Sequence, residues 1–499
     1  MATKQKQAAQ PTYIDKNLDL KLAFETITAK KAPYDLLYAY YKGNHPLKYS
    51  TDRLRKAFDK IYVYFAENWI AVIIDAVLDR LNLKGFDIAN DAASKRLMEL
   101  WEQYHIHLMA DDVHEAATVV GEGYVIAWKE ENDKGEEVTD VYYNDPRMCH
   151  VFYDPYRPTE KLYAAKMWID GKTRHPKMML YYPDRLEHYI SQSVISRQES
   201  WISSSGGFQP DKAYGDNGTE PNEYGVIPVF HFRAGRMSGK KEIGQTEISL
   251  QDAVNKLFAD MMVSSEFYTF TQRVIITNAD VGDMKNGPGI NWVIPAGDGK
   301  GQASSVQELG NKSLTPYLEA IDKLAQALAI ISRTPKHYLM LTGSDPSGDA
   351  LLAMEAPLNK KVKKRMEGYE VEWKSLAIFL LKLEGIDVNA KDVSPVWEPT
   401  ETIQPKASAD TVKTETDSGI PLVTAVRRRG WASDEIKQME EDMKEQDKRK
   451  SGLAQDALNK MRAQGATDNT NPDGTPKKIA DPFKQAATSN IQDVNNAKP

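Results

Sequence analysis

The second half of the chain carries three long segments in which apolar residues recur at intervals of three and four. These segments cover residues 246–268, 315–333 and 349–383. Such spacing gathers the apolar side chains on one face and therefore predicts amphipathic helices, the first of them roughly 35 Å long. Between the first two, RVIIT (273–277) and INWVI (290–294) are typical of strands. The predicted order is helix, small strand-and-loop unit, helix, short loop and long helix.

Local signals predict where these helices begin, end and bend. Thr315 and Pro316 predict the start of the second helix, as N-cap and first helical residue. Thr334 followed by Pro335 predicts its end. Pro357 lies inside the third segment, where its ring and its missing N–H are expected to kink the helix.

In the first half of the chain the spacing of apolar residues changes once, from a helical pattern to an alternating one. Residues 18–117 favour helices, with the clearest amphipathic patterns at 51–65 and 68–83. From residue 118 to 233, short alternating runs separated by turn residues predict a β-rich unit. Inside this unit, the polar and glycine-rich residues 203–223 are expected to form a long exposed loop.

Beyond Gly385 the apolar patterns weaken. Residues 407–450 favour two or three short helices, and residues 465–499 contain almost nothing to bury, which predicts disorder in isolation. Because helical segments and β-rich segments occupy separate stretches of the chain, the expected fold class is α+β.

Composition excludes several classes of protein. Apolar residues are 41% of the 499 residues and charged residues 27%, which is typical of globular chains. The longest apolar stretches fall far short of the ~20 residues that span a bilayer, so we expect no membrane association. The polar N-terminus lacks a signal-peptide core, and the single cysteine, Cys149, fits a reducing cytosol.

Catalytic and metal-binding motifs give weak signals. The best metal candidate is the stretch from His105 to His114, in which His107, Asp111 and His114 would share a helix face beside Asp112. With no fourth ligand evident, a solvated helix end is the favoured interpretation. The glycines near residues 299 and 343–348 are not followed by the residues of a phosphate loop. We therefore predict no catalytic residue, no metal site and no cofactor.

Charge gives a further limit. The 64 Lys and Arg residues against 71 Asp and Glu give a net charge of -7, which argues against a surface that grips nucleic acid everywhere. It does not exclude a protein past which nucleic acid slides.

The densest basic cluster is Lys360, Lys361, Lys363, Lys364 and Arg365. A DNA contact is one interpretation, and pairing along the exposed helix face with Glu367, Glu370 and Glu372 is the favoured one. Arg427, Arg428 and Arg429, close to Trp431, form a shorter run with the same ambiguity.

The order of these segments resembles that of the portal proteins of long-tailed double-stranded DNA bacteriophages. The most specific stretches are EISLQDAVNKLFADMMVSSE (247–266) and SDPSGDALLAMEAPLNKKVKKRMEGYEVEW (344–373). Shorter stretches that resemble portal proteins occur in the same order as in that family, at residues 40–47, 68–86, 121–128, 145–155 and 224–235. Together the resemblance covers roughly residues 35–383.

The resemblance implies a phage portal fold with named parts. These are a helical and β-rich wing, a two-helix stem, a small α/β clip, a tunnel loop, a long kinked wing helix and a helical crown. The implied boundaries are 1–117 and 118–243 for the wing, 244–268 for the first stem helix, 269–314 for the clip, 315–333 for the second stem helix, 334–348 for the tunnel loop, 349–385 for the long kinked helix, 386–464 for the crown and 465–499 for a disordered tail.

The same resemblance implies a structural function rather than an enzymatic one. Portal proteins form a dodecameric ring at one capsid vertex, and double-stranded DNA is packaged and ejected through its channel without sequence specificity. The implied partners are further copies of the chain, the large terminase subunit, the major capsid and scaffolding proteins, and the head-tail adaptor proteins. The implied location is the portal vertex of the virion, after assembly in the host cytoplasm.

Certain residues become candidates for facing DNA if the resemblance holds. They are Lys336 and His337 in the tunnel loop, and Lys285, Lys300 and Lys312 in the clip. The other tunnel-loop positions singled out are Thr334, Leu341, Gly343, Asp345 and Gly348. Leu339, Met340 and Leu341 are expected to pack beneath the loop rather than line it. Two alternatives stay open, a metalloenzyme acting on nucleic acid through the His105–His114 stretch and another minor head protein.

Overall fold

The computed structural model divides the chain into two compact units, Met1–Thr414 and Glu415–Pro499. It describes residues 13–45, 67–131, 135, 137–196, 201–202, 207–235, 240–269, 273–276, 305–308, 313–339, 347–400, 405–429, 431 and 433–467. The first unit combines helices with antiparallel sheets, which confirms the expected α+β class.

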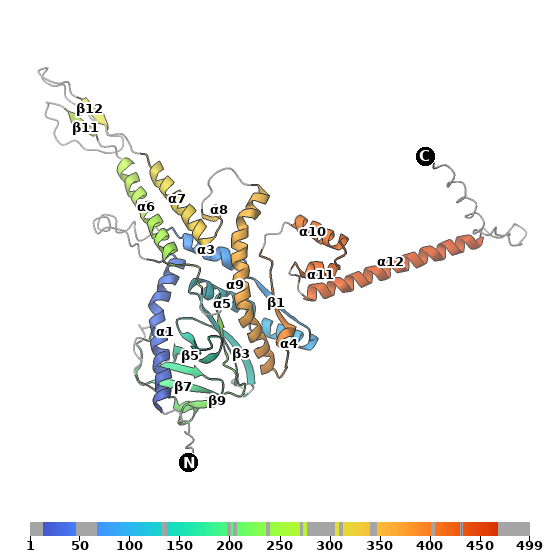
Figure 1. Ribbon diagram of the computed structural model, residues 1–499, viewed down its shortest axis with the longest axis horizontal. Helices are drawn as coiled ribbons and strands as arrows, with labels where there is room; N and C mark the ends of the chain where they lie inside the picture. The colour runs from blue at the N-terminus through green and yellow to red at the C-terminus, as the bar shows by residue number, and fades with distance from the viewer. Residues whose placement is uncertain are drawn as a thin grey trace, which may run out of the picture. The chain divides into compact units, whose positions relative to one another are not determined.

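The secondary-structure elements follow one another in a mixed order (Figure 1). The helices are α1 Tyr13–Tyr41, α3 Trp69–Leu78, α4 Asp91–Gln103, α5 Ile106–Val119, α6 Gln245–Thr269, α7 Thr315–Ser332, α8 Lys336–Leu339, α9 Gly348–Leu383, α10 Pro405–Asp417, α11 Leu422–Arg427 and α12 Ser433–Thr467, with single 3-10 turns at Lys212–Tyr214 and Ala390–Asp392. The strands are β1 Leu83–Ile88, β2 Gly123–Glu131, β3 Glu137–Asn144, β4 Cys149–Tyr153, β5 Lys161–Ile169, β6 Pro176–Tyr181, β7 Arg185–Ser191, β8 Phe208–Pro210, β9 Thr219–Pro221, β10 Val229–Phe232, β11 Arg273–Ile276, β12 Ser305–Glu308 and β13 Val393–Trp397.

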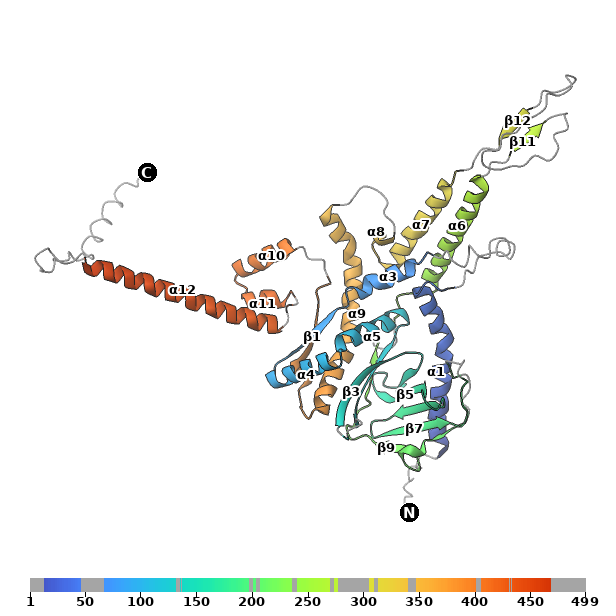
Figure 2. The same ribbon diagram turned by 180° about the vertical axis from the view of Figure 1, so that it is seen from behind.

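Two antiparallel sheets make up the β-rich part that the alternating pattern predicts. One has the order β10-β2-β3, and the other has the order β4-β5-β6-β7-β8, with β9 also paired to β7. Along β5, Tyr163, Ala165 and Met167 alternate onto a core shared with α1, where Ala23 and Ile27 are fully buried. In both views α1 runs beside this sheet (Figures 1 and 2).

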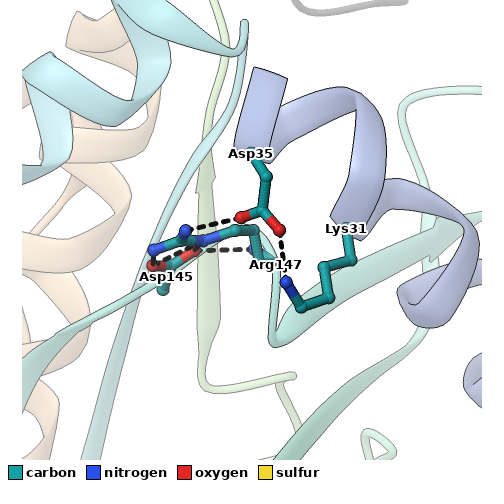
Figure 3. Close-up of polar contacts among 4 residues, drawn as sticks. All are labelled: Lys31, Asp35, Asp145 and Arg147. Atoms are coloured by element: carbon teal, nitrogen blue, oxygen red, sulfur yellow. Dashed lines mark hydrogen bonds and ion pairs between the residues drawn. The ribbon is translucent and has the colours of Figure 1, made fainter. Parts of the chain in front are cut away.

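A cluster of charged side chains ties α1 to the turn between β3 and β4 (Figure 3). The guanidinium of Arg147 donates to Asp145 (Nη2–Oδ2 2.6 Å) and to Asp35 (Nη1–Oδ1 2.8 Å), and Lys31 binds the other oxygen of Asp35. Burial alone would raise the pKa of Asp35, but the hydrogen bonds from Lys31 and Arg147 outweigh it and lower that pKa. Because these side chains are about one-third exposed, the cluster orients α1 more than it stabilises it.

The long helix α9 lies at the centre of the largest apolar core. Its predicted apolar stripe is buried throughout, at Leu358, Val362, Met366, Tyr369, Trp373, Leu376, Leu380 and Leu383. The stripe packs on α4, β2 and β10. At Gly368 a Cβ atom would lie 3.0 Å from the Cα of Ala234, so a glycine there permits the close approach of helix and chain. The helix predicted over 349–383 is confirmed, with Pro357 inside it.

The helix predicted over 68–83 is too long. Its helical part ends at Leu78, and β1 begins at Leu83 and pairs with β13, which follows α9. In β1, Phe86 and Ile88 are buried in the core around α9. The expectation of helices over 18–117 misses β1, because a strand whose partner lies so far along the chain leaves little local signal.

The exposed loop predicted over 203–223 is right only in part, because most of its described residues are exposed but two short strands lie within it. Residues 208–210 and 219–221 form β8 and β9, which both pair with β7. Gly218 permits this packing, since its φ is +61° and a Cβ there would lie 2.6 Å from the carbonyl oxygen of His188. Asn222 is buried and donates to the carbonyl of Tyr182 at 2.9 Å. The buried Asp211 and Asn222 bind backbone groups, whereas the composition of the stretch alone suggested contact with water throughout.

Of the other sequence expectations, some are confirmed and some fall outside the described residues. The strand predicted at 273–277 is β11, and its partner is β12, which the sequence did not suggest. The amphipathic segment 51–65 and the strand 290–294 lie outside the described residues. The short helices expected over 407–450 are α10, α11 and the start of α12, which continues to Thr467. Across the described ranges, the helices lack the combined length and apolar character that crossing a bilayer demands.

Candidate functional site

The helices predicted over 246–268 and 315–333 are α6 and α7, which lie side by side as a hairpin (Figures 1 and 2). The hydroxyl groups of Ser264 and Tyr317 meet across it at 3.1 Å. Helix α7 begins one residue earlier than predicted, with Leu314 as its N-cap. The hydroxyl of Ser313 accepts the N–H of Thr315, so a serine outside the helix does the capping expected of Thr315.

Buried contacts fix the base of this hairpin to α1 and α3. Asp252 of α6 accepts a hydrogen bond from the hydroxyl of Tyr40 at 2.8 Å, and the Gln251 side chain accepts the N–H of Trp69 at 2.9 Å. An apolar cluster joins α3 to both helices of the hairpin and to α8, and it is formed by Trp69, Ile73, Val254, Ile321, Ala325, Leu328, Ala329 and Leu339. Because buried polar groups need partners, the bonds orient the hairpin on the body of the first unit.

A buried charged joint connects the hairpin to α9. Glu242, just before α6, binds Lys361 (Nζ–Oε2 3.0 Å) and Arg365 (Nε–Oε1 2.6 Å), both on α9. Lys361 also donates to the carbonyl of Ser332 at the end of α7 (2.8 Å). Burial would raise the pKa of Glu242, but Lys361 and Arg365 outweigh it and lower that pKa.

This joint corrects the interpretation of the basic cluster. Lys361 and Arg365 turn inward to Glu242 and do not pair with glutamates along an exposed face. Glu372, one of the expected partners, instead binds Lys161 of β5 at 3.1 Å. These two basic side chains are therefore structural and do not offer their charge to DNA. In the second unit, Arg429 pairs with Glu415 at 3.1 Å, and Trp431 is 43% exposed.

Two of the described tunnel-loop candidates, Lys336 and His337, lie in the one-turn helix α8 together with Leu339. Lys336 pairs with Asp322 of α7 (Nζ–Oδ1 2.9 Å), and the hydrogen bond from Lys336 lowers the pKa of Asp322. His337 packs edge-on against Tyr338. Leu339 is buried in the apolar cluster at the base of the hairpin, which confirms that it packs and does not line a surface. Thr334 is also buried.

The remaining candidates divide between two places. Gly348 is the first residue of α9, after Ser347, whose side chain caps the helix by accepting the N–H of Ala350 at 3.3 Å. The others lie outside the described residues; they are Lys285, Lys300, Lys312, Met340, Leu341, Gly343 and Asp345.

The metal candidate on α5 does not assemble. His107 and Asp111 are exposed, whereas His114 is buried and its Nε2 accepts the indole N–H of Trp373 at 2.9 Å. The solvated-helix interpretation is therefore wrong for His114, since this residue belongs to the core around α9. Within the ranges that the structure describes, no three His, Cys, Asp or Glu side chains are grouped as a metal site requires.

A buried polar network that sequence reasoning missed lies between α1 and the sheets. Glu122 accepts from Tyr34 (Oη–Oε1 2.7 Å) and from Lys30, and its other oxygen lies 3.4 Å from Nε2 of His231. Burial would raise the pKa of Glu122, but His231 and Lys30 outweigh it and lower that pKa. The only local signal was a charged residue placed between two glycines, in GEGYV.

The cysteine beside this network is unsuited to catalysis. Cys149 is fully buried in the core between the two sheets, and burial raises the pKa of its thiol to about 12. The thiol is therefore protonated at neutral pH, whereas a nucleophilic cysteine needs an accessible thiolate.

His114 generates a prediction about pH. Burial lowers its pKa from 6.5 to about 3, so the unfolded chain binds one more proton than the folded chain between these values. Stability should fall as the pH drops below 6.5, with a slope approaching about 1.4 kcal/mol per pH unit. We expect His114→Gln, which keeps an acceptor for Trp373, to lose this part of the slope in urea unfolding between pH 7 and pH 5. The exposed His107→Gln is the control, and parallel curves for wild type and His114→Gln would contradict the assignment.

The joint at Glu242 generates a second prediction. Glu242→Gln leaves Lys361 and Arg365 buried without their counter-charge, and breaking a buried pair in this way costs roughly 3 kcal/mol or more. We expect a correspondingly lower free energy of unfolding by urea. Glu367→Gln makes the same chemical change at an exposed position of α9 and should stay within about 0.5 kcal/mol of wild type. Equal effects of the two substitutions would show that the joint carries no special stability.

Comparison with known proteins shows which family the chain is similar to. The family described as "Phage portal protein, SPP1 Gp6-like" matches residues 23–450. A curated relative named portal protein, from Mycobacterium phage D29, is 23% identical in an alignment over 390 residues that covers 73% of this chain and 76% of the relative. Another of the same name, from Mycobacterium phage L5, is 22% identical over 435 residues, covering 83% of this chain and 84% of the relative. The family match extends through both sheets, the hairpin and α9, and the chain therefore belongs to the SPP1 Gp6-like family of phage portal proteins.

Proposed function

We propose that twelve copies of this chain form the portal ring at one vertex of a phage capsid, and that double-stranded DNA enters and leaves through its channel. The observation that carries the proposal is the element order α6, β11–β12, α7, α8 and α9 within the stretch that the portal family matches. A two-helix hairpin held rigidly at its base is suited to line a passage, since its position does not depend on a ligand.

The parts of the portal fold are assigned on the same basis. Helices α6 and α7 are the stem, residues 269–314 the clip and residues 334–348 the tunnel loop. The elements from α1 to β10, together with α9, form the wing. We begin the crown at α10, about residue 405, later than the sequence suggested, because β13 pairs with β1, a strand of the wing. Residues 465–499 are the tail.

The charges on α7 and α8 support a channel that guides DNA without gripping it. Lys336 is matched by Asp322 of the same chain, so its charge is largely balanced before DNA arrives. Each phosphate that a protein neutralises adds affinity, and twelve unbalanced lysines in one ring would hold a duplex tightly. The net charge of -7 per chain acts in the same direction. No base-specific contact is expected, because packaging accepts any sequence.

The proposal also sets partners and location. The chain acts without catalysis, and the large terminase subunit supplies the energy for packaging. The major capsid and scaffolding proteins surround the ring during assembly in the host cytoplasm, and head-tail adaptor proteins later bind the clip. In the virion the ring occupies the portal vertex.

Ring formation is the first test. Electron microscopy of the purified full chain, or of particles, should show twelve-fold rings with an axial hole, in particles at one vertex only. Particles that contain the chain as scattered single copies would refute the proposal.

The pair of Lys336 and Asp322 provides the second test, on purified rings. Asp322→Asn removes the counter-charge of Lys336, so we expect tighter binding of duplex DNA at low salt. The slope of log affinity against log salt should steepen by about 0.9 for each additional phosphate contact. Adding Lys336→Gln should restore the wild-type slope.

The control for this test is Glu319→Gln, which makes the same charge change at an exposed position of α7. It should leave the slope unchanged. If it steepens the slope as much as Asp322→Asn does, the effect belongs to net charge and not to Lys336.

A further inference from the structure

The one-turn helix α8 is held in place through the hydroxyl of Tyr338. This hydroxyl accepts a hydrogen bond from Nη2 of Arg80 at 2.8 Å and donates to Oε1 of Glu355 at 3.1 Å. Arg80 follows α3, and Glu355 lies in the first turns of α9. One phenol oxygen therefore joins α8 both to the start of α9 and to Arg80, which lies 258 residues earlier in the chain.

Arg80 is fixed more firmly than an ordinary surface arginine. Its side chain is 12% exposed, as is that of Glu355, and its Nη2 lies 3.5 Å from Oε2 of this carboxylate. Its Nε donates to the side chain of Asn359 at 3.1 Å, and its Nη1 donates to the carbonyl of Ala76 at 2.9 Å. With its donors distributed over α3, α8 and α9, the planar guanidinium has little freedom to turn.

A second attachment lies on the same helix. Lys361 of α9 holds the carbonyl of Ser332 at the end of α7, six residues further along α9 than Glu355. At 1.5 Å per residue the two attachments are about 9 Å apart. The turn at residues 333–335 that joins α7 to α8 is therefore held to α9 on both sides, at Ser332 and at Tyr338.

A helix of one turn cannot hold its own position, because too few hydrogen bonds compensate the loss of backbone freedom. The place of α8 therefore depends on its contacts with other elements. These contacts are the Tyr338 hydroxyl, the buried Leu339 and the pair of Lys336 with Asp322. Of the three, the Tyr338 hydroxyl alone bonds both to Arg80, just after α3, and to α9.

We propose that Arg80 is a positioning residue of the DNA channel, which acts through Tyr338 and Glu355 to set α8, and with it Lys336 and His337, against α9. The inference rests on the proposed function, since only a portal channel brings these two side chains to DNA. Arg80 itself does not touch DNA. Its effect is to keep twelve copies of α8 at one height, so that a moving duplex meets a uniform ring.

The test uses Tyr338→Phe in the full chain, assembled as rings. This change removes both hydrogen bonds and keeps the ring that packs beside His337. Hydrogen exchange measured by mass spectrometry should become roughly tenfold faster at residues 336–339, since two bonds to partly buried charged groups are lost. Exchange along α6 and α9 should stay unchanged.

The matched control is Tyr182→Phe. The hydroxyl of Tyr182 donates to Asp19 at 2.9 Å, and the guanidinium of Arg185 lies over its ring, much as Arg80 lies over the ring of Tyr338. It should not alter exchange at α8. Wild-type exchange at α8 in Tyr338→Phe, or equal loosening by both variants, would overturn the positioning role.

A second measurement asks whether the position of α8 matters for DNA. A phage lacking its own portal gene is supplied with each variant, and the DNA retained per particle is measured. We expect Tyr338→Phe and Arg80→Gln to assemble particles but to lose several-fold more DNA than Tyr182→Phe. Faster exchange at α8 with normal DNA retention would overturn the link to the channel. The proposed function would stand in that case, because it is judged on wild-type rings.

Discussion

The burial of one face of α9 is the constraint on which the rest of the first unit depends. Trp373 and Tyr369 are fully buried, and each large apolar side chain buried in this way contributes about 1.5 to 3 kcal/mol. The indole of Trp373 reaches His114 of α5, and Gly368 lets the chain after β10 approach the helix. Strand β13 then returns to pair with β1. Helices α4 and α5, the sheet of β10, β2 and β3, and the pair of β1 and β13 thus share one core with a single helix.

The polar contacts of α9 select one arrangement of this packing over others. Buried ion pairs are costly to desolvate, so they add less to stability than to the choice of one arrangement over others. Glu242 meets two basic side chains of α9, and Glu355 meets Arg80 and Tyr338. The apolar stripe would tolerate a shift along the helix better than these fixed pairs. The hairpin and α8 therefore acquire definite positions relative to α9, as the proposed ring of identical subunits would require.

Much of the fold was predictable from local patterns. Helices α6, α7 and α9 follow from apolar residues three and four apart, and strands β2 to β7 follow from alternation, because each pattern reflects the geometry of a single element. The failures lie where a partner is distant. Strand β1 finds β13 after α9, and β8 and β9 complete a sheet through an unusual backbone at Gly218. The same holds for the candidate site, where Lys336 was identified by its type but its partner Asp322 was not.

By itself, the sequence determined the periods of its segments, the order of helix, strand unit, helix and long helix, and the resemblance to portal proteins. Each of these depends on the type and spacing of residues that are close together in the sequence. The tertiary structure alone decided which charges meet. Lys361 and Arg365 had Glu367 and Glu370 within two turns, yet they bind Glu242, more than a hundred residues earlier in the chain. The reason is physical: their side chains face the interior, where leaving a charge unpaired is far more costly than on a solvated helix face.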